Sequence, residues 1–137
     1  MASNENPTVM IVDDDDMMLQ MAEFILKQDD TINILTVKSG LECLRTLQSG
    51  EKIDLILLDI QMPGMDGIKV MELIQKHDYW KQIPVIFLTA SSDKNTVMKA
   101  GQMGAVGYIK KPFAPADFIQ RINAVCPTKL DAKNFKS

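Results

Sequence analysis

The sequence predicts a single α/β domain in which helices cover both faces of a parallel sheet. The chain has 137 residues, of which 46% are hydrophobic, and this is the length and composition of one globular core. Short apolar segments rich in β-branched residues recur five times. Helical patterns lie between them, and such alternation is typical of right-handed βαβ units in a doubly wound sheet.

Each strand is predicted from a short apolar segment. The five segments are Val9–Val12, Ile32–Val37, Ile53–Leu58, Val85–Thr89 and Val106–Ile109. The third is almost continuously apolar, as expected of a central strand buried on both faces, and we expect Asp54 to mark its exposed start. Pro84 lies where the fourth strand can begin without losing a ladder hydrogen bond.

Apolar residues at helical spacing follow the first three strands. They are Met18, Met21 and Ile25 in the first helix, Cys43, Leu44 and Leu47 in the second, and Met71 and Ile74 in the third. Ser39 and Glu42 form a capping box, and Gly50 is suited to end that helix. Pro115 suits the first turn of the last helix, and Pro127 suits its end.

Charge and composition narrow the class of partner. A net charge of -3 supplies no basic field for nucleic acid or an anionic membrane. The apolar segments are far shorter than a membrane span, and residues 1–8 lack a signal-peptide pattern, so we expect a cytoplasmic protein. Cys43 and Cys126 are expected to be reduced, buried thiols. The polar segment Thr128–Ser137 is expected to be a tether or frayed end.

Polar residues follow four of the predicted strands. Asp13–Asp16 follow the first, Asp59 the third, Thr89 ends the fourth, and Lys110 and Lys111 follow the fifth. Ligand sites of open α/β sheets lie beyond the carboxyl ends of the strands, so we expect these side chains to meet.

Carboxylates brought together repel one another and call for a cation. Oxygen ligands suit Mg²⁺ or Mn²⁺, and Mg²⁺ also accepts phosphate oxygens. We assign Asp13 and Asp14 to such a site, because a helix cap alone does not explain the matching polar residues at the other strands. Asp15 and Asp16 are interpreted as capping acids of the first helix.

Four motifs, in this order, resemble the receiver domain of two-component response regulators over residues 8–126. They are VDD at Val12–Asp14, LLDIQMPGMDG at Leu57–Gly67, LTA at Leu88–Ala90 and KPF at Lys111–Phe113. The resemblance implies a (βα)5 flavodoxin-like domain with strand order 2-1-3-4-5. Residues 1–7 would be an N-terminal extension, and residues 127–137 a polar tail or linker.

The resemblance also implies a role for each site residue. Asp59 would be the phosphoacceptor, and Mg²⁺ would be held by Asp13, Asp14, Asp59 and the backbone carbonyl of Gln61. Lys111, preceding a cis Pro112, would contact the phosphoryl group, whereas Lys110 would be solvated. Thr89 would bond a phosphoryl oxygen and Tyr108 would swing inward, changing the surface formed by the fourth helix, fifth strand and fifth helix. Gln61 and Ser91 stand where side chains tune the lifetime of the phosphoryl group.

The function implied is a signalling switch that catalyses only its own modification. A sensor histidine kinase or a histidine phosphotransfer protein would donate the phosphoryl group, and an output domain or protein would read the switched surface. His77 is the only histidine, and we interpret it as a solvated residue at a helix end, so the phosphohistidine must belong to a partner. Tyr79 and Trp80 are assigned no role.

Three alternatives are weighed against the switch. A receiver-like module could bind partners without phosphorylation, although all the expected site residues are present. A Mg²⁺ phosphatase with an aspartyl nucleophile would want an acid where Gln61 stands. A flavodoxin-like nucleotide module would want a Gly- or Ser/Thr-rich turn where the four aspartates stand.

Overall fold

The computed structural model describes residues 6–90 and 94–134. Within these residues, five strands form one parallel sheet in the order β2-β1-β3-β4-β5, which confirms the predicted fold and strand order. The strands are β1 (Thr8–Val12), β2 (Asn33–Val37), β3 (Leu55–Asp59), β4 (Val85–Thr89) and β5 (Gly107–Lys110).

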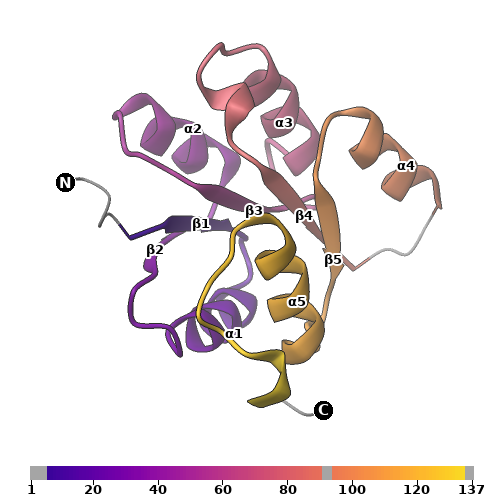
Figure 1. Ribbon diagram of the computed structural model, residues 1–137. Helices are drawn as coiled ribbons and strands as arrows, with labels where there is room; N and C mark the ends of the chain where they lie inside the picture. The colour runs from indigo at the N-terminus through magenta and orange to yellow at the C-terminus, as the bar shows by residue number, and fades with distance from the viewer. Residues whose placement is uncertain (1–5, 91–93, 135–137) are drawn as a thin grey trace.

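Helices cover both faces of the sheet (Figure 1). They are α1 (Asp16–Leu26), α2 (Gly40–Gln48), α3 (Gly67–Gln75), α4 (Lys94–Gln102) and α5 (Pro115–Val125), with short 3-10 helices η2 (Trp80–Gln82) and η3 (Ala132–Asn134). The helices α1 and α5 cover one face, and α2, α3 and α4 cover the other (Figure 1). No helix in the described part of the chain is long and apolar enough to cross a membrane.

The central strand β3 divides its side chains between two apolar layers. Leu55 and Leu57 pack in the layer under α1 and α5, whereas Ile56 and Leu58 pack in the layer under α2 and α3. This confirms the prediction of a strand buried on both faces. The prediction that Asp54 marks an exposed start of this strand is wrong. Asp54 precedes the strand and is half-buried, and its Oδ2 accepts the backbone N–H of Thr8 at 2.8 Å.

Side-chain caps fix where the helices begin. Asp15 caps α1 by accepting the backbone N–H groups of Met17 and Met18. Ser39 caps α2 and Asp66 caps α3 in the same way. Asp16, the first residue of α1, forms an ion pair with Lys38. The helix starts therefore lie where the polar residues predicted them.

The C-terminal segment corrects the prediction of a tether or frayed end. Leu130 is buried in the layer under α1 and α5, and the backbone N–H of Lys129 donates to the buried Asp29 at 2.7 Å. Asn123 bonds both Thr128 and Leu130. We call residues 128–134 the C-terminal strap. Leu130, the carboxylate of Asp29 and the side chain of Asn123 all hold this strap, and composition alone did not reveal those contacts.

The prediction of reduced, buried thiols is confirmed for Cys43, whereas for Cys126 the free thiol is confirmed and the burial is wrong. Both are free, and Cys43 is fully buried in α2. Burial raises the pKa of the Cys43 thiol to about 12, so it stays protonated and unreactive. Cys126 is only half-buried, because it stands just beyond α5 at the helix end.

Candidate functional site

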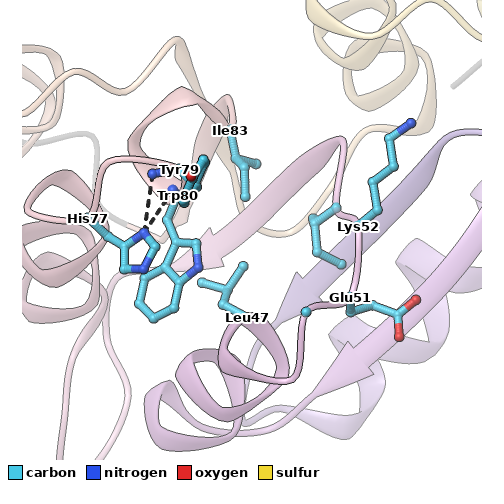
Figure 2. Close-up of a pocket in the computed structure, with 9 residues that line it drawn as sticks. Leu47, Glu51, Lys52, His77, Tyr79, Trp80 and Ile83 are labelled. Carbon is cyan, nitrogen blue, oxygen red and sulfur yellow. Dashed lines mark hydrogen bonds between the residues drawn. The ribbon is translucent and has the colours of Figure 1, made fainter.

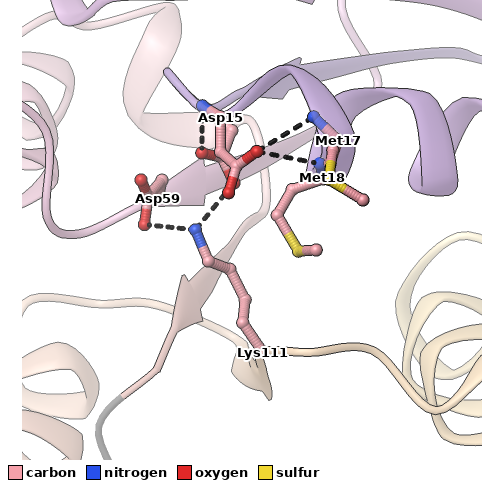
Figure 3. Close-up of polar contacts among 6 residues, drawn as sticks. Asp15, Met17, Met18, Asp59 and Lys111 are labelled. Atoms are coloured by element: carbon pink, nitrogen blue, oxygen red, sulfur yellow. Dashed lines mark hydrogen bonds and ion pairs between the residues drawn. The ribbon is translucent and has the colours of Figure 1, made fainter.

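Side chains from three strand ends meet at one edge of the sheet. Asp13 follows β1, Asp59 ends β3 and Lys111 follows β5. The Nζ atom of Lys111 lies 2.8 Å from Oδ2 of Asp13 and 3.2 Å from Oδ1 of Asp59 (Figure 3). Lys110 is exposed instead, since successive side chains of a strand point to opposite faces. The fold thus gathers residues that are 98 positions apart in sequence.

Burial makes this cluster electrostatically unusual. Asp13 and Asp59 are almost completely buried. Burial, followed by the charge of Asp13, raises the pKa of Asp59 to about 7, although Lys111 opposes the change. Burial alone would lower the pKa of Lys111, but its hydrogen bond to Asp13 and the nearby carboxylates raise it. The ammonium group of Lys111 therefore stays charged between the two acids.

One atom of the cluster lacks a partner. Oδ2 of Asp59 is buried and makes no hydrogen bond to any described residue. Leaving a buried carboxylate oxygen unpaired is unfavourable, so the site is suited to something that would satisfy that atom. A cation or a covalently bound group would do so.

The acidic residues have the arrangement of a metal site. Asp13, Asp14 and Asp59 each offer one carboxylate oxygen, and these atoms lie within 4.8 Å of one another. Asp14 is exposed, so an ion held here would keep contact with solvent. An oxygen-only donor set with room for water fits Mg²⁺ or Mn²⁺. Gln61 stands two residues beyond Asp59, in the loop that leads to α3.

Gly67 brings α3 directly against the backbone of Asp59. A Cβ atom at Gly67 would lie 2.2 Å from the carbonyl oxygen of Asp59. The backbone N–H of Gly67 donates to the carbonyl of Ile60 at 2.8 Å. This bond closes the loop that contains Gln61. Nothing in the local sequence pattern indicates how close these two segments come.

Thr89 and Tyr108 lie on neighbouring strands, β4 and β5. Thr89 is buried at the end of β4, and its carbonyl accepts the backbone N–H of Lys111 at 2.8 Å. Tyr108 is half-buried, and the guanidinium carbon of Arg121 lies 5.2 Å from its ring centre. The predicted switch roles of both residues stay predictions, and Arg121 was not predicted from the sequence.

Ser91, which was expected to tune the lifetime of the phosphoryl group, lies outside the described residues. The expected cis bond between Lys111 and Pro112 is present.

Away from this cluster, a hollow of about 330 Å³ lies between the end of α2 and η2, next to the segment before β3 (Figure 2). His77 and Trp80 stack along its wall with ring centres 3.9 Å apart. The Nδ1 atom of His77 accepts the backbone N–H groups of Tyr79 and Trp80. The expectation of a solvated His77 is therefore wrong, because the ring is half-buried and holds the following turn. Tyr79 is 79% exposed.

The chain is similar to known proteins over most of its length. The response regulator receiver domain family matches residues 9–123. The transcriptional regulatory protein YvrH of Bacillus subtilis is 35% identical over 133 residues, which are 97% of this chain and 54% of that protein. The chemotaxis protein CheY-3 of Vibrio cholerae is 31% identical over 122 residues, which are 89% of this chain and 93% of that protein. The chain thus spans about half of one relative and nearly all of the other.

The fold matches solved structures equally well. The chemotaxis protein CheY4 of Vibrio cholerae superposes with a TM-score of 0.81 and 26% identity. The match covers 88% of this chain and 98% of that one. The likeness therefore extends over most of the chain.

Proposed function

The chain belongs to the response regulator receiver domain family, and from that premise we propose that it accepts a phosphoryl group on Asp59. The donor is the phosphohistidine of a sensor histidine kinase or a histidine phosphotransfer protein. Receiver domains are signalling switches, so this one acts only on its own modification. We further propose that this exchange takes place in the cytoplasm.

The observation that carries this proposal is the contact of Lys111 with Asp13 and Asp59. A carboxylate that attacks a phosphoryl group is an anion approaching an anion, so the reaction needs positive charge on both sides of the transferred group. The Nζ atom of Lys111, 3.2 Å from Oδ1 of Asp59, supplies that charge on one side. The carboxylate oxygens of Asp13 and Asp14, which lie within 4.8 Å of an oxygen of Asp59, offer a place for a second positive charge.

These acids, with the backbone carbonyl of Gln61, would hold Mg²⁺ or Mn²⁺. Such an ion, when bound, would neutralise charge and help to orient the phosphoryl oxygens. An oxygen of Asp59 then forms a bond to phosphorus while the P–N bond to the donor histidine breaks, and the leaving imidazole retains the electron pair. Lys111 contacts one phosphoryl oxygen, and the hydroxyl of Thr89 donates to another. The pKa of Asp59, about 7 without metal, makes its ionisation depend on that nearby positive charge.

The output of the switch is a change in the surface of α4, β5 and α5. Phosphorylation adds negative charge and acceptor oxygens beside Thr89 and so shifts a population between two packings. Tyr108 on β5 follows that shift, and an output domain or protein binds the altered surface. The relative YvrH, which is a transcriptional regulatory protein about twice the length of this chain, supports an output of this kind.

Intact mass spectrometry after incubation with acetyl phosphate and Mg²⁺ tests the proposal. We expect wild type to gain one phosphoryl group, and we expect no gain for Asp59→Asn or for wild type with a chelator. Asp66→Asn is the matched control, because Asp66 is exposed and asparagine is an equally good helix cap. Folded wild type that gains nothing would favour a module that binds its partners without phosphorylation.

A further inference from the structure

Arg121 is placed to control the position of Tyr108. Its guanidinium carbon lies 5.2 Å from the centre of the tyrosine ring, within the distance at which a cation and an aromatic face attract each other. Its Nε atom also donates to both carboxylate oxygens of Asp117, at 3.0 and 3.1 Å. Asp117 stands one turn earlier in α5 and so fixes the arginine over the ring.

The other side of Tyr108 is open. A hollow of about 170 Å³ lies between α4 and β5, and Tyr108 forms part of its wall. The rest of the wall is made of small or medium side chains: Val97, Ala100, Gly101, Ala105, Val106 and Gly107. No residue of α5 lines it. The ring therefore has free space on the side of α4, and Arg121 holds it on the side of α5.

We propose that Arg121, oriented by Asp117, is a latch that stabilises Tyr108 in the position seen here and thereby opposes phosphorylation of Asp59. This proposal rests on the proposed function, in which the phosphorylated state uses a second position of the ring. Moving the ring away from α5 breaks the contact with Arg121. A contact made only in the unphosphorylated packing lowers the population of the packing that favours phosphorylation. Because coupling between two sites is reciprocal, the contact then also opposes phosphorylation of Asp59.

The contact between Arg121 and the ring of Tyr108 is weak. Both Arg121 and Asp117 are about two-fifths exposed, and a cation–aromatic contact at an exposed site corresponds to a population change of about two- to fivefold. Such a contact biases the switch without locking it. Arg121 is a positioning residue, since it touches neither the acceptor nor the phosphoryl group.

Fluorine NMR tests the ring contact without any phosphorylation. The chain has two tyrosines, so protein labelled with 3-fluorotyrosine gives two signals. Tyr79, which is 79% exposed, is the internal reference. We expect Arg121→Gln to move the Tyr108 signal and leave the Tyr79 signal unchanged, with a smaller shift in Arg121→Lys. A Tyr108 signal that is the same in wild type and Arg121→Gln overturns the latch.

A double-mutant cycle tests its effect on the acceptor. With acetyl phosphate and Mg²⁺, we expect Arg121→Gln to be phosphorylated about two to five times faster than wild type, and Asp117→Asn to be accelerated less. In a Tyr108→Leu background, Arg121→Gln should have no effect. Lys99→Gln controls for charge, because Lys99 is an exposed cation of α4.

Two results would overturn the proposal. One is an equal acceleration in the Tyr108→Leu background, and the other is an equal acceleration by Lys99→Gln, since either would mean that net charge rather than the ring contact sets the rate. Wild type that is never phosphorylated would refute the proposed function and the regulatory role together. The NMR comparison would still decide whether Arg121 holds the ring.

Discussion

Replacing Asp59 with asparagine should stabilise the metal-free domain above about pH 7. The folded state raises the pKa of Asp59 from 3.8 to about 7, so the folded protein binds this proton more tightly than the unfolded chain does. The resulting stability is fully present below pH 3.8 and is lost as the pH rises towards about 7. Asparagine does not titrate, so the variant does not lose stability in this way.

The size of the effect follows from the shift in pKa. One pKa unit corresponds to about 1.4 kcal/mol, so a shift of about three units lowers the free energy of unfolding by about 4 kcal/mol once Asp59 is ionised. Between about pH 5 and about pH 7, wild type should lose about 2 kcal/mol relative to Asp59→Asn. That is a large share of the ~5–15 kcal/mol by which a domain is stable.

Urea unfolding followed by circular dichroism at several pH values, with a chelator present, measures this difference. Asp66→Asn, which removes an exposed carboxylate from a helix cap, should run parallel to wild type. Adding Mg²⁺ should restore the stability of wild type above pH 7 more than that of Asp59→Asn, because the ion binds only the folded state. A constant gap between wild type and Asp59→Asn across the pH range would refute the electrostatic account of the site.

Three further predictions concern single contacts. Lys111→Ala should slow phosphorylation by acetyl phosphate at least about tenfold, whereas Lys110→Ala should leave the rate near that of wild type; equal rates would show that the wrong lysine is assigned. Gly67→Ala should weaken Mg²⁺ binding in calorimetry, because the new methyl group displaces the backbone of Asp59. Gly101→Ala in α4 should not weaken it, because Gly101 has open space around it. Asp29→Ala should lower the free energy of unfolding by about 1–3 kcal/mol and expose the C-terminal strap to trypsin. Thermal unfolding that matches the exposed neighbour variant Asp30→Ala would contradict that role.

The fold and the main site residues could be predicted because their signals are local. Apolar runs marked the strands, and the polar residues directly after them marked one edge of a parallel sheet. The position of Lys111 beside Asp59 followed from a resemblance in motif rather than from spacing. In the same way, the cap Ser39 could be predicted from Glu42, only three positions away.

The remaining features depend on contacts between distant segments. The close approach of Gly67 to Asp59 depends on how α3 leaves the sheet, which no pattern within the loop encodes. His77 was expected to be solvated, but its ring stacks on Trp80 and accepts two backbone N–H groups. Arg121 resembles any exposed helical arginine until the ring of Tyr108 is placed beside it.

The docking of the C-terminal strap has a practical consequence for protein engineering. A chimaera that joins a new effector module directly after Cys126 would discard Leu130, which is 7% exposed, and the backbone N–H that Asp29 binds. The apolar layer under α1 and α5 would then be open to solvent. A junction placed after Asn134 keeps that layer closed. The same effector module attached there should therefore give a fusion protein that is more stable and aggregates less.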